Sequence, residues 1–397
     1  MTRKFTSLEI FSGAGGLATG LTKAGAEHVG FIEWNTHACN TLRENYLPSI
    51  VHNVDIKDVS FSKFGNVDII AGGPPCQPFS LGGKHQGHND ARDMFPYATK
   101  AISTCLPKAF IFENVKGLLR KSFSKYFEYV LLRLTYPETS AEDYVDWEDH
   151  LSALEKIHTS GMYCGAKYNV IFRLVDTADY GIPQRRERVI IVGIRSDLGI
   201  QWSFPNKTHS LDALLWSQYV RSDYWESHGI TKSHCDNLNR QMSTRAAKLQ
   251  SIYGFFPPQE QPWRTVRDAI GDLPRPDKSG SFDSEHTLRE GARIYPGHTG
   301  SYIDLPAKAL KAGVHGVPGG ENMIRFRDGS VRYFTTFEAK RIQTFPDNYR
   351  ITGAWTEAMR QLGNAVPVEL SFLISKSLID TVLHPTKREF PLIHTEE

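Results

Sequence analysis

Short apolar runs alternate with longer amphipathic stretches through the first half of the chain. Runs rich in β-branched and aromatic residues, which favour strands, lie at residues 8–11, 28–33, 67–71, 109–113, 170–175 and 189–194. Between them, apolar residues recur at helical spacing over residues 16–24, 36–46, 92–106 and 123–134. This alternation predicts an α/β fold with a doubly wound, mostly parallel sheet.

The pattern becomes irregular in the second half. Residues 201–335 are rich in glycine, proline, histidine and aromatic residues without a sustained period, which predicts a smaller domain of irregular build. Periodicity returns at residues 336–342 and 369–383, and we expect the last helix to pack back on the first domain. The predicted organisation is a catalytic and cofactor-binding domain over 1–200, a second domain over 201–335 and a returning segment over 336–397.

Residues 136–158 interrupt the first domain with many acidic side chains around Trp147 and Leu151. We interpret this stretch as an inserted helix with a solvated face. We assign no catalytic or binding residue to this stretch.

Composition narrows the class of protein. The 397 residues are 40% hydrophobic and 23% charged, and the net charge is only +2, so a nucleic-acid face would have to be a local cluster of cations. Five widely spaced cysteines without a Cys-x-x-Cys pair indicate neither a disulfide framework nor a zinc site. Because no apolar run approaches the roughly 20 residues of a membrane span, we expect a cytoplasmic protein that does not enter a membrane.

A strand entering a glycine turn and then a helix occupies residues 8–17. In this geometry backbone N–H groups and a helix start can face a cofactor, although a simple tight turn has the same pattern. Glu33 ends the second strand about twenty residues later, where its carboxylate can accept both hydroxyls of a ribose. Trp34 would stack on an adenine and Ile56 would pack on it, while Asp55 could accept from the adenine amino group or cap its own loop.

One cysteine is presented by a rigid turn. The apolar run 67–71 ends in Gly-Gly-Pro-Pro-Cys-Gln-Pro, in which prolines fix the backbone around Cys76 and glycines allow close approach of a ligand. A lone cysteine is more often structural, but a thiol delivered to a sheet edge in this way indicates a nucleophile.

Four motifs follow one another along the chain. They are Gly-Gly-Pro-Pro-Cys-Gln at 72–77, Glu-Asn-Val at 113–115, Gln-Arg-Arg-Glu-Arg at 184–188 and Gly-Asn-Ala-Val at 363–366. Together they resemble the C5-cytosine-specific DNA methyltransferases of bacterial and phage restriction-modification systems. The resemblance implies a Rossmann-like domain that uses S-adenosylmethionine, a target-recognition domain, and methyl transfer to C5 of a flipped-out cytosine in a short duplex sequence.

The resemblance also implies residue roles. Cys76 would attack C6 of cytosine, and Glu113, whose pKa burial would raise, would donate a proton to N3. Arg188 would contact the cytosine O2, and Arg186 a backbone phosphate or the active-site loop. The cofactor would contact Phe11, Gly13, Gly15, Gly16, Leu17, Glu33, Trp34, Asp55, Ile56, Pro75, Asn364 and Val366.

Two further segments are expected to serve DNA. The glycine-rich, cationic loop 81–92 is suited to closing over the duplex, and its two histidines lack the further ligands that a metal site needs, so no metal is expected. In the target-recognition domain, many members of the family carry a threonine where Ala309 stands. The cations that could bind phosphate or read guanine there are Arg264, Arg267, Lys278, Arg289, Arg293, Lys308, Lys311, Arg325, Arg327 and Arg332.

The expected partners are double-stranded DNA and a cognate restriction endonuclease, with the chain acting as a monomer. One alternative is an RNA cytosine-C5 methyltransferase built on the same catalytic half, against which the large second domain argues. Another is a sequence-specific DNA binder without catalysis, against which the presence of Cys76, Glu113 and Arg188 argues.

Overall fold

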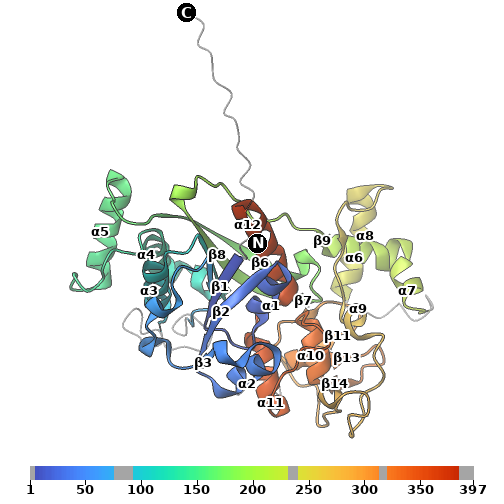
Figure 1. Cartoon of the computed structure of the whole chain (residues 1–397). Coiled ribbons are helices and arrows are strands. Elements are labelled where there is room, and N and C mark those ends of the chain that lie inside the picture. The colour runs from blue at the N-terminus through green and yellow to red at the C-terminus, as the bar shows by residue number, and fades with distance from the viewer. Residues whose placement is uncertain (1–4, 76–92, 231–239, 313–319, 384–397) are drawn as a thin grey trace, which may run out of the picture.

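The structure is a computed structural model that describes residues 5–75, 93–230, 240–312 and 320–383 (Figure 1). Its centre is a seven-stranded sheet with the strand order β3-β2-β1-β4-β5-β8-β6. The strands are β1 (Phe5–Ile10), β2 (Ala26–Glu33), β3 (Val51–Asn53), β4 (Ile69–Gly72), β5 (Ala109–Val115), β6 (Tyr168–Asp176) and β8 (Glu187–Arg195).

All neighbouring strands of this sheet are parallel except at β8, which runs antiparallel to both β5 and β6. The predicted α/β class and mostly parallel sheet are therefore confirmed. The chain builds outward from β1 through β2 to β3, and then in the other direction through β4 to β5. Ligands of such sheets bind at the carboxyl ends of the strands where the direction reverses, here between β1 and β4.

Helices cover both faces of the sheet. The helices α1 (Gly16–Lys23) and α12 (Val368–Leu383) pack together over one apolar face, and α3 (Phe95–Cys105) and α4 (Ser124–Thr135) cover the other. A Cβ on Gly20 would lie 2.3 Å from Ser371, so only glycine allows α1 and α12 to approach this closely. The last helix thus lies against the first helix of the chain.

The acidic insertion forms a shorter helix than its composition predicts. Helix α5 (Trp147–Ser160) begins at Asp146, whose carboxylate accepts from the backbone N–H groups of Glu148 and Asp149. One side of α5 is buried against α4 through His150, Leu151 and Leu154. The stretch is therefore solvated on one side only.

The second half of the chain consists of short elements. These elements are β9 (His209–Ser210), α6 (Leu211–Leu215), α7 (Asp223–Ser227), α8 (Arg240–Tyr253), β10 (Gln261–Pro262), α9 (Val266–Ile270), β11 (Ser301–Tyr302), β12 (Ala307–Lys308), β13 (Met323–Arg325), β14 (Val331–Tyr333), α10 (Thr336–Ile342) and α11 (Trp355–Asn364). The first half also contains helix α2 (Thr36–Asn45) and the two-residue strand β7 (Gln184–Arg185). Strands β11, β13 and β14 form a three-stranded sheet, and β12 pairs with β7. One core joins Ala14 of the glycine turn to Ile324, Phe334 and Leu362, so these segments are anchored on the cofactor side of the large sheet.

Among the described residues, none of the helices combines the length and the apolar character needed to cross a membrane.

Candidate active site

Two glycines of the turn after β1, Gly15 and Gly16, are packed so tightly that a side chain would not fit. Gly15 has a φ of 81°, and a Cβ there would lie 2.6 Å from the hydroxyl of Tyr349. That hydroxyl donates to the carbonyl of Ala14 at 2.7 Å. A Cβ on Gly16 would lie 2.2 Å from the carbonyl oxygen of Val366. The turn therefore touches the C-terminal Gly-Asn-Ala-Val segment, as a cofactor pocket built from both ends of the chain requires.

Phe11 stands at the start of this turn in a strained conformation. Its φ is 52°, which is unfavourable for any residue with a Cβ. The following residue holds the backbone in place, because Ser12 N–H and its hydroxyl both donate to the carbonyl of Ile32 at 3.2 Å. Strain of this kind is typical of functional turns, and here it lies where a cofactor would bind.

Glu33 joins the glycine turn to the end of β2. Its two carboxylate oxygens accept from the backbone N–H groups of Gly13 and Asn35, both at 2.8 Å. Only 7% of Glu33 is exposed, and this burial raises the pKa of its carboxyl, an effect that the backbone donors and the charge of Arg360 oppose. Each carboxylate oxygen keeps a lone pair with which to accept a hydroxyl.

The adjoining residues provide surfaces for a planar base. The Trp34 side chain is 73% exposed, whereas Ile56 is buried in the adjacent turn. Asp55 caps its own loop, because one carboxylate oxygen accepts from the backbone N–H of Lys57 at 3.0 Å. Asn364 is exposed at the end of α11, and Val366 is buried beside Leu17 in the core under α1. These positions fit an adenosine whose ribose lies on Glu33.

Cys76 and the loop 81–92 lie outside the described residues, but the chain on either side of them is held at the sheet edge. The backbone N–H of Met94 donates to the carbonyl of Pro75 at 3.3 Å. The side-chain amide of Asn114 donates to the carbonyl of Pro74 at 3.1 Å. A Cβ on Gly73 would lie 3.3 Å from Oε2 of Glu113. The residue before Cys76 thus belongs to a turn in contact with the Glu-Asn-Val motif.

Glu113 and Arg188 meet at the same edge. They lie near the ends of the antiparallel strands β5 and β8, and the Nε of Arg188 is 2.5 Å from Oε1 of Glu113. Nε of Arg188 has no acceptor in hydrogen-bond geometry, so the contact is an ion pair rather than an aligned hydrogen bond. Both side chains are largely buried. A carboxyl and a guanidinium side by side can bind the N3 and O2 edge of a pyrimidine.

Arg186 stands between β7 and β8 and is almost completely buried. Its guanidinium is buried and donates to the carbonyl of Leu310 at 3.2 Å and to that of Gly363 at 2.7 Å. Complete burial, with the nearby charge of Arg188, lowers its pKa well below the usual value. A guanidinium that is buried and bound to two carbonyls does not favour the expected phosphate contact. The expected contact with the active-site loop stays a prediction, because that loop lies outside the described residues.

Three residues position the site without an assignment from the sequence. Gln184, fully buried, accepts from the N–H of Leu310 at 2.9 Å and donates to the side chain of Gln343 at 3.1 Å. Asn114 and Tyr349 hold the two turns described above. Gln184 and Asn114 belong to motifs that the sequence shows, Gln-x-Arg and Glu-Asn, so both could have been found from the sequence. No motif surrounds Tyr349.

The cations of residues 201–335 separate into two groups. Arg267 and Arg327 both pair with the fully buried Asp304, at 2.6 and 3.0 Å. Of the other cations that the sequence offers for DNA, Arg332, Lys278 and Lys311 pair with Glu338, Glu290 and Glu321 respectively. Within the described part of the chain, no ion pair involves Arg264, Arg289, Arg293, Lys308 or Arg325.

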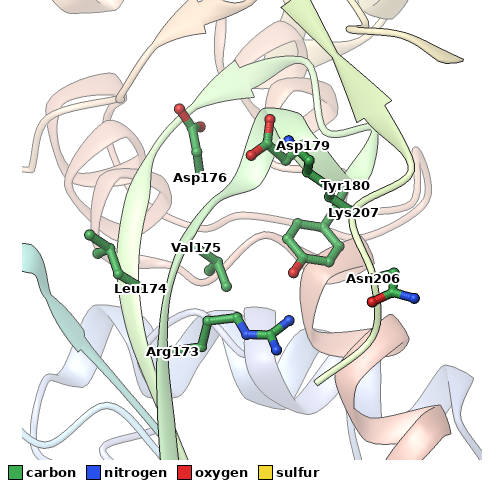
Figure 2. Close-up of a pocket in the computed structure, with 8 residues that line it drawn as sticks. All are labelled: Arg173, Leu174, Val175, Asp176, Asp179, Tyr180, Asn206 and Lys207. Carbon is green, nitrogen blue, oxygen red and sulfur yellow. The ribbon is translucent and has the colours of Figure 1, made fainter. Parts of the chain in front are cut away.

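A cavity of about 360 Å³ lies between the end of β6 and the segment of Asn206 and Lys207 (Figure 2). Arg173 and Tyr180 line it on one side and Asn206 on the other, with Asp176 and Asp179 at one end. Asp176 accepts from Nε of Arg185 and Asp179 from the indole N–H of Trp263. None of the predicted site residues lines this cavity, so it is not the reaction site.

Comparison with known proteins places the sequence in a family. The model of the family described as C-5 cytosine-specific DNA methylase matches residues 5–136 and 148–380, and the break falls in the acidic insertion. The Type II methyltransferase M.Eco47II of Escherichia coli is 32% identical over 97% of this chain and 81% of its own length. The Type II methyltransferase M.PspPI of Psychrobacter sp. is 32% identical over 95% of this chain and 80% of its own.

Solved structures agree on the fold. The S. pombe Dnmt2 methyltransferase aligns with a TM-score of 0.57 and 19% identity, covering 96% of this chain and 100% of that one. The Entamoeba histolytica methyltransferase EhMeth aligns with a TM-score of 0.56 and 15% identity, covering 97% and 100%.

Proposed function

Because the chain belongs to the C-5 cytosine-specific DNA methylase family, we propose that it methylates a flipped-out cytosine through a covalent bond between Cys76 and C6. Family membership confirms the predicted reaction, which is methyl transfer from S-adenosylmethionine to C5 of cytosine in DNA. The observation that carries the residue assignment is the Glu113–Arg188 ion pair beside the Pro74–Pro75 turn.

S-adenosylmethionine supplies an electrophilic methyl group when it is bound. Glu33 accepts the ribose hydroxyls, Trp34 stacks on the adenine and Ile56 packs against it. The remaining contacts come from the glycine turn, Pro75, Asp55 and the segment from Asn364 to Val366. The buried carboxylate, the exposed indole and the glycine positions without room for a Cβ support this assignment.

The protein's own groups activate the cytosine. The Cys76 thiolate adds to C6 while Glu113, in its protonated form, donates a proton to N3, which makes an enamine whose C5 can attack the methyl group. Arg188 binds O2 and stabilises the charge that develops on the ring. Loss of the C5 proton to a base and elimination across C5–C6 then release Cys76 as a thiolate, and N3 returns its proton to Glu113, which restores the aromatic ring and the acid.

Arg186 positions this machinery and does not touch substrate. Its two carbonyl partners lie in the segment of the second domain next to the site and in the cofactor-closing segment. It therefore holds both segments against the strand that bears Arg188.

We further propose that the chain is the modification enzyme of a restriction-modification system in a bacterial cell and acts as a monomer. The Type II methyltransferase names of its relatives support this role. Residues 201–335 would recognise the target duplex, and a cognate endonuclease would cut the same unmethylated site. The RNA and non-catalytic alternatives gain no support, because the matching family is described as acting on DNA.

The test is trapping on 5-fluorocytosine DNA. The wild-type protein, with S-adenosylmethionine and a fluorinated duplex library, should form a protein–DNA adduct that survives denaturation, because fluorine at C5 cannot leave as a proton. Cys76→Ser should form no adduct, and Glu113→Gln should form it at least about 100-fold more slowly, the scale of a lost general acid.

Cys164→Ser is the matched control, because Cys164 is an exposed thiol remote from every motif, and its adduct should form at the wild-type rate. An adduct that persists in Cys76→Ser would refute the nucleophile. Methylated product without any adduct from wild-type protein would refute the covalent mechanism.

A further inference from the structure

Four residues of the second domain form a surface that carries charge without a carboxylate to balance it. We call Thr299, Tyr302, Lys308 and Arg325 the β11 surface, because all of them lie on or contact strand β11 or the residues just before it. Neither Lys308 nor Arg325 forms an ion pair with any described residue. Both cations therefore keep their charge available for a polyanion.

This surface adjoins the active-site edge. Strand β12 pairs with β7, so that Ala307 lies opposite Gln184 and Lys308 opposite Arg185. Arg188 follows three residues later along the same chain segment, and β7 and β11 lie near each other in Figure 1. A duplex that places a flipped cytosine at Arg188 must therefore pass close to Lys308.

Arg325 is preorganised for a planar acceptor. It lies opposite Tyr302 in the pairing of β11 with β13, and its guanidinium stacks over the tyrosine ring at 4.8 Å. Nη1 donates to the Tyr302 hydroxyl at 2.7 Å, while Nη2 donates to no described residue. A guanidinium held by a ring and a hydroxyl in this way loses little rotamer freedom when it binds the O6 and N7 of guanine.

Lys308 is suited to a phosphate. Its ammonium donates to the hydroxyl of Thr299 at 2.8 Å, and its backbone N–H donates to the hydroxyl of Ser301 at 3.0 Å. A neutral hydroxyl orients the ammonium without neutralising it, which leaves its charge for a DNA phosphate. Arg267 and Arg327 differ in this respect, because each already pairs with the buried Asp304.

We propose that the β11 surface binds the duplex beside the target cytosine, with Arg325 reading a guanine in the major groove and Lys308 binding a backbone phosphate. The proposal rests on the proposed function, and it identifies residues that determine sequence specificity. Arg325 should act at one base pair, whereas Lys308 should act equally on all sequences.

The experiment methylates a randomised duplex library and sequences the products after cytosine conversion. Arg325→Gln should lose about 10- to 100-fold of the preference for guanine at one position of the site, the range expected for a bidentate arginine contact. Lys308→Gln should keep the wild-type preference but bind DNA more weakly, and its logarithmic salt dependence should fall by about 1.

Lys125→Gln and Lys376→Gln are the matched controls, because both cations lie outside residues 201–335, on surface pairs with Glu148 and Asp380. Both should match wild type in preference and salt dependence. Thermal midpoints of all variants establish that they are folded. An Arg325→Gln enzyme with reduced activity and unchanged base preference, or a Lys308→Gln enzyme with the wild-type salt slope, overturns the respective assignment. Absence of methylation by wild type would instead refute the proposed function.

Discussion

At the scale of single residues, the chemistry of this protein depends on charges held where burial opposes them. Glu33 is the clearest case, since its carboxylate is buried and accepts two backbone N–H groups, and it forms no ion pair with a described residue. Its usefulness to a ribose depends on the ionised form. Because burial raises its pKa, that form is lost at a higher pH than for an exposed glutamate.

Glu33→Gln should weaken S-adenosylmethionine binding about 10- to 100-fold, the range for losing hydrogen bonds to a charged group. Wild-type affinity should be full well above the raised pKa and should fall as the pH decreases through it, whereas the Gln variant should show no such decrease. Calorimetric titrations across pH measure both. Glu44→Gln, at an exposed position on α2, is the control, and a Gln variant with the wild-type pH profile would contradict this role.

At the scale of elements, the acidic insertion shows that composition alone does not define a helix's buried side. Helix α5 is anchored by His150, which is fully buried, lies 3.1 Å from the hydroxyl of Tyr129 and stacks on Tyr144. Burial, and secondarily the charge of Arg133, lowers the pKa of His150 to about 4. The histidine is therefore neutral in the folded protein at pH values where an unfolded histidine is protonated.

This shift makes the docking of α5 sensitive to acid. The stabilising contribution is complete above the unfolded pKa of about 6.5 and is lost progressively as the pH falls toward 4, because the unfolded chain binds the proton first. His150→Phe should flatten the pH dependence of stability in that window. Denaturant unfolding at pH 7, 6 and 5 measures it, with the exposed His37→Gln as the control; parallel pH dependence in His150→Phe and wild type would disprove the effect.

At the scale of the whole molecule, the catalytic sheet, the second domain and the C-terminal segment converge on buried polar contacts. Arg186 bonds to Leu310 and Gly363, and Gln184 bonds to Leu310 and Gln343. A Cβ on Gly363 would lie 2.6 Å from the backbone of Lys311, so the segments approach closely here. These contacts join the segment that contains Gly363, proposed to close the cofactor site, to the segment that contains Leu310 and Lys311, proposed to face DNA.

Arg186→Met should lower the free energy of unfolding by about 2 kcal/mol or more, because two buried carbonyls lose their donor. It should also weaken the binding of both S-adenosylmethionine and DNA, since each partner segment shifts. Arg186→Lys should not restore function, because an ammonium cannot span both carbonyls as a planar guanidinium does. The neighbouring Arg185→Met, at an exposed position, is the control.

Denaturant unfolding and separate titrations of the two ligands make the measurement. If Arg186→Met were as stable as the wild type and its logarithmic salt dependence of DNA binding were lower by about 1, the result would contradict the positioning role and support the phosphate contact that the sequence predicted.

Local patterns in the sequence determined the fold class, most element positions and the family. The spacing of apolar residues along a strand or a helix depends only on which face of that element is buried. It can therefore be recognised without knowing which other elements pack against that face. The strands at 28–33 and 189–194 are predicted to within two residues at each end. The motifs and their order along the chain can likewise be read without a structure, and they identified the reaction.

Only the tertiary structure decided the fate of individual charges. Arg186 and Arg188 share one motif, yet the carbonyls of Leu310 and Gly363 hold the first in the interior, whereas the second lies beside Glu113. Likewise Asp304 pairs with Arg267 and Arg327 but not with Arg325. Lys340 is fully buried and donates to Glu285 and to two backbone carbonyls. A cation's role depends on partners distant in sequence, and no local pattern encodes them.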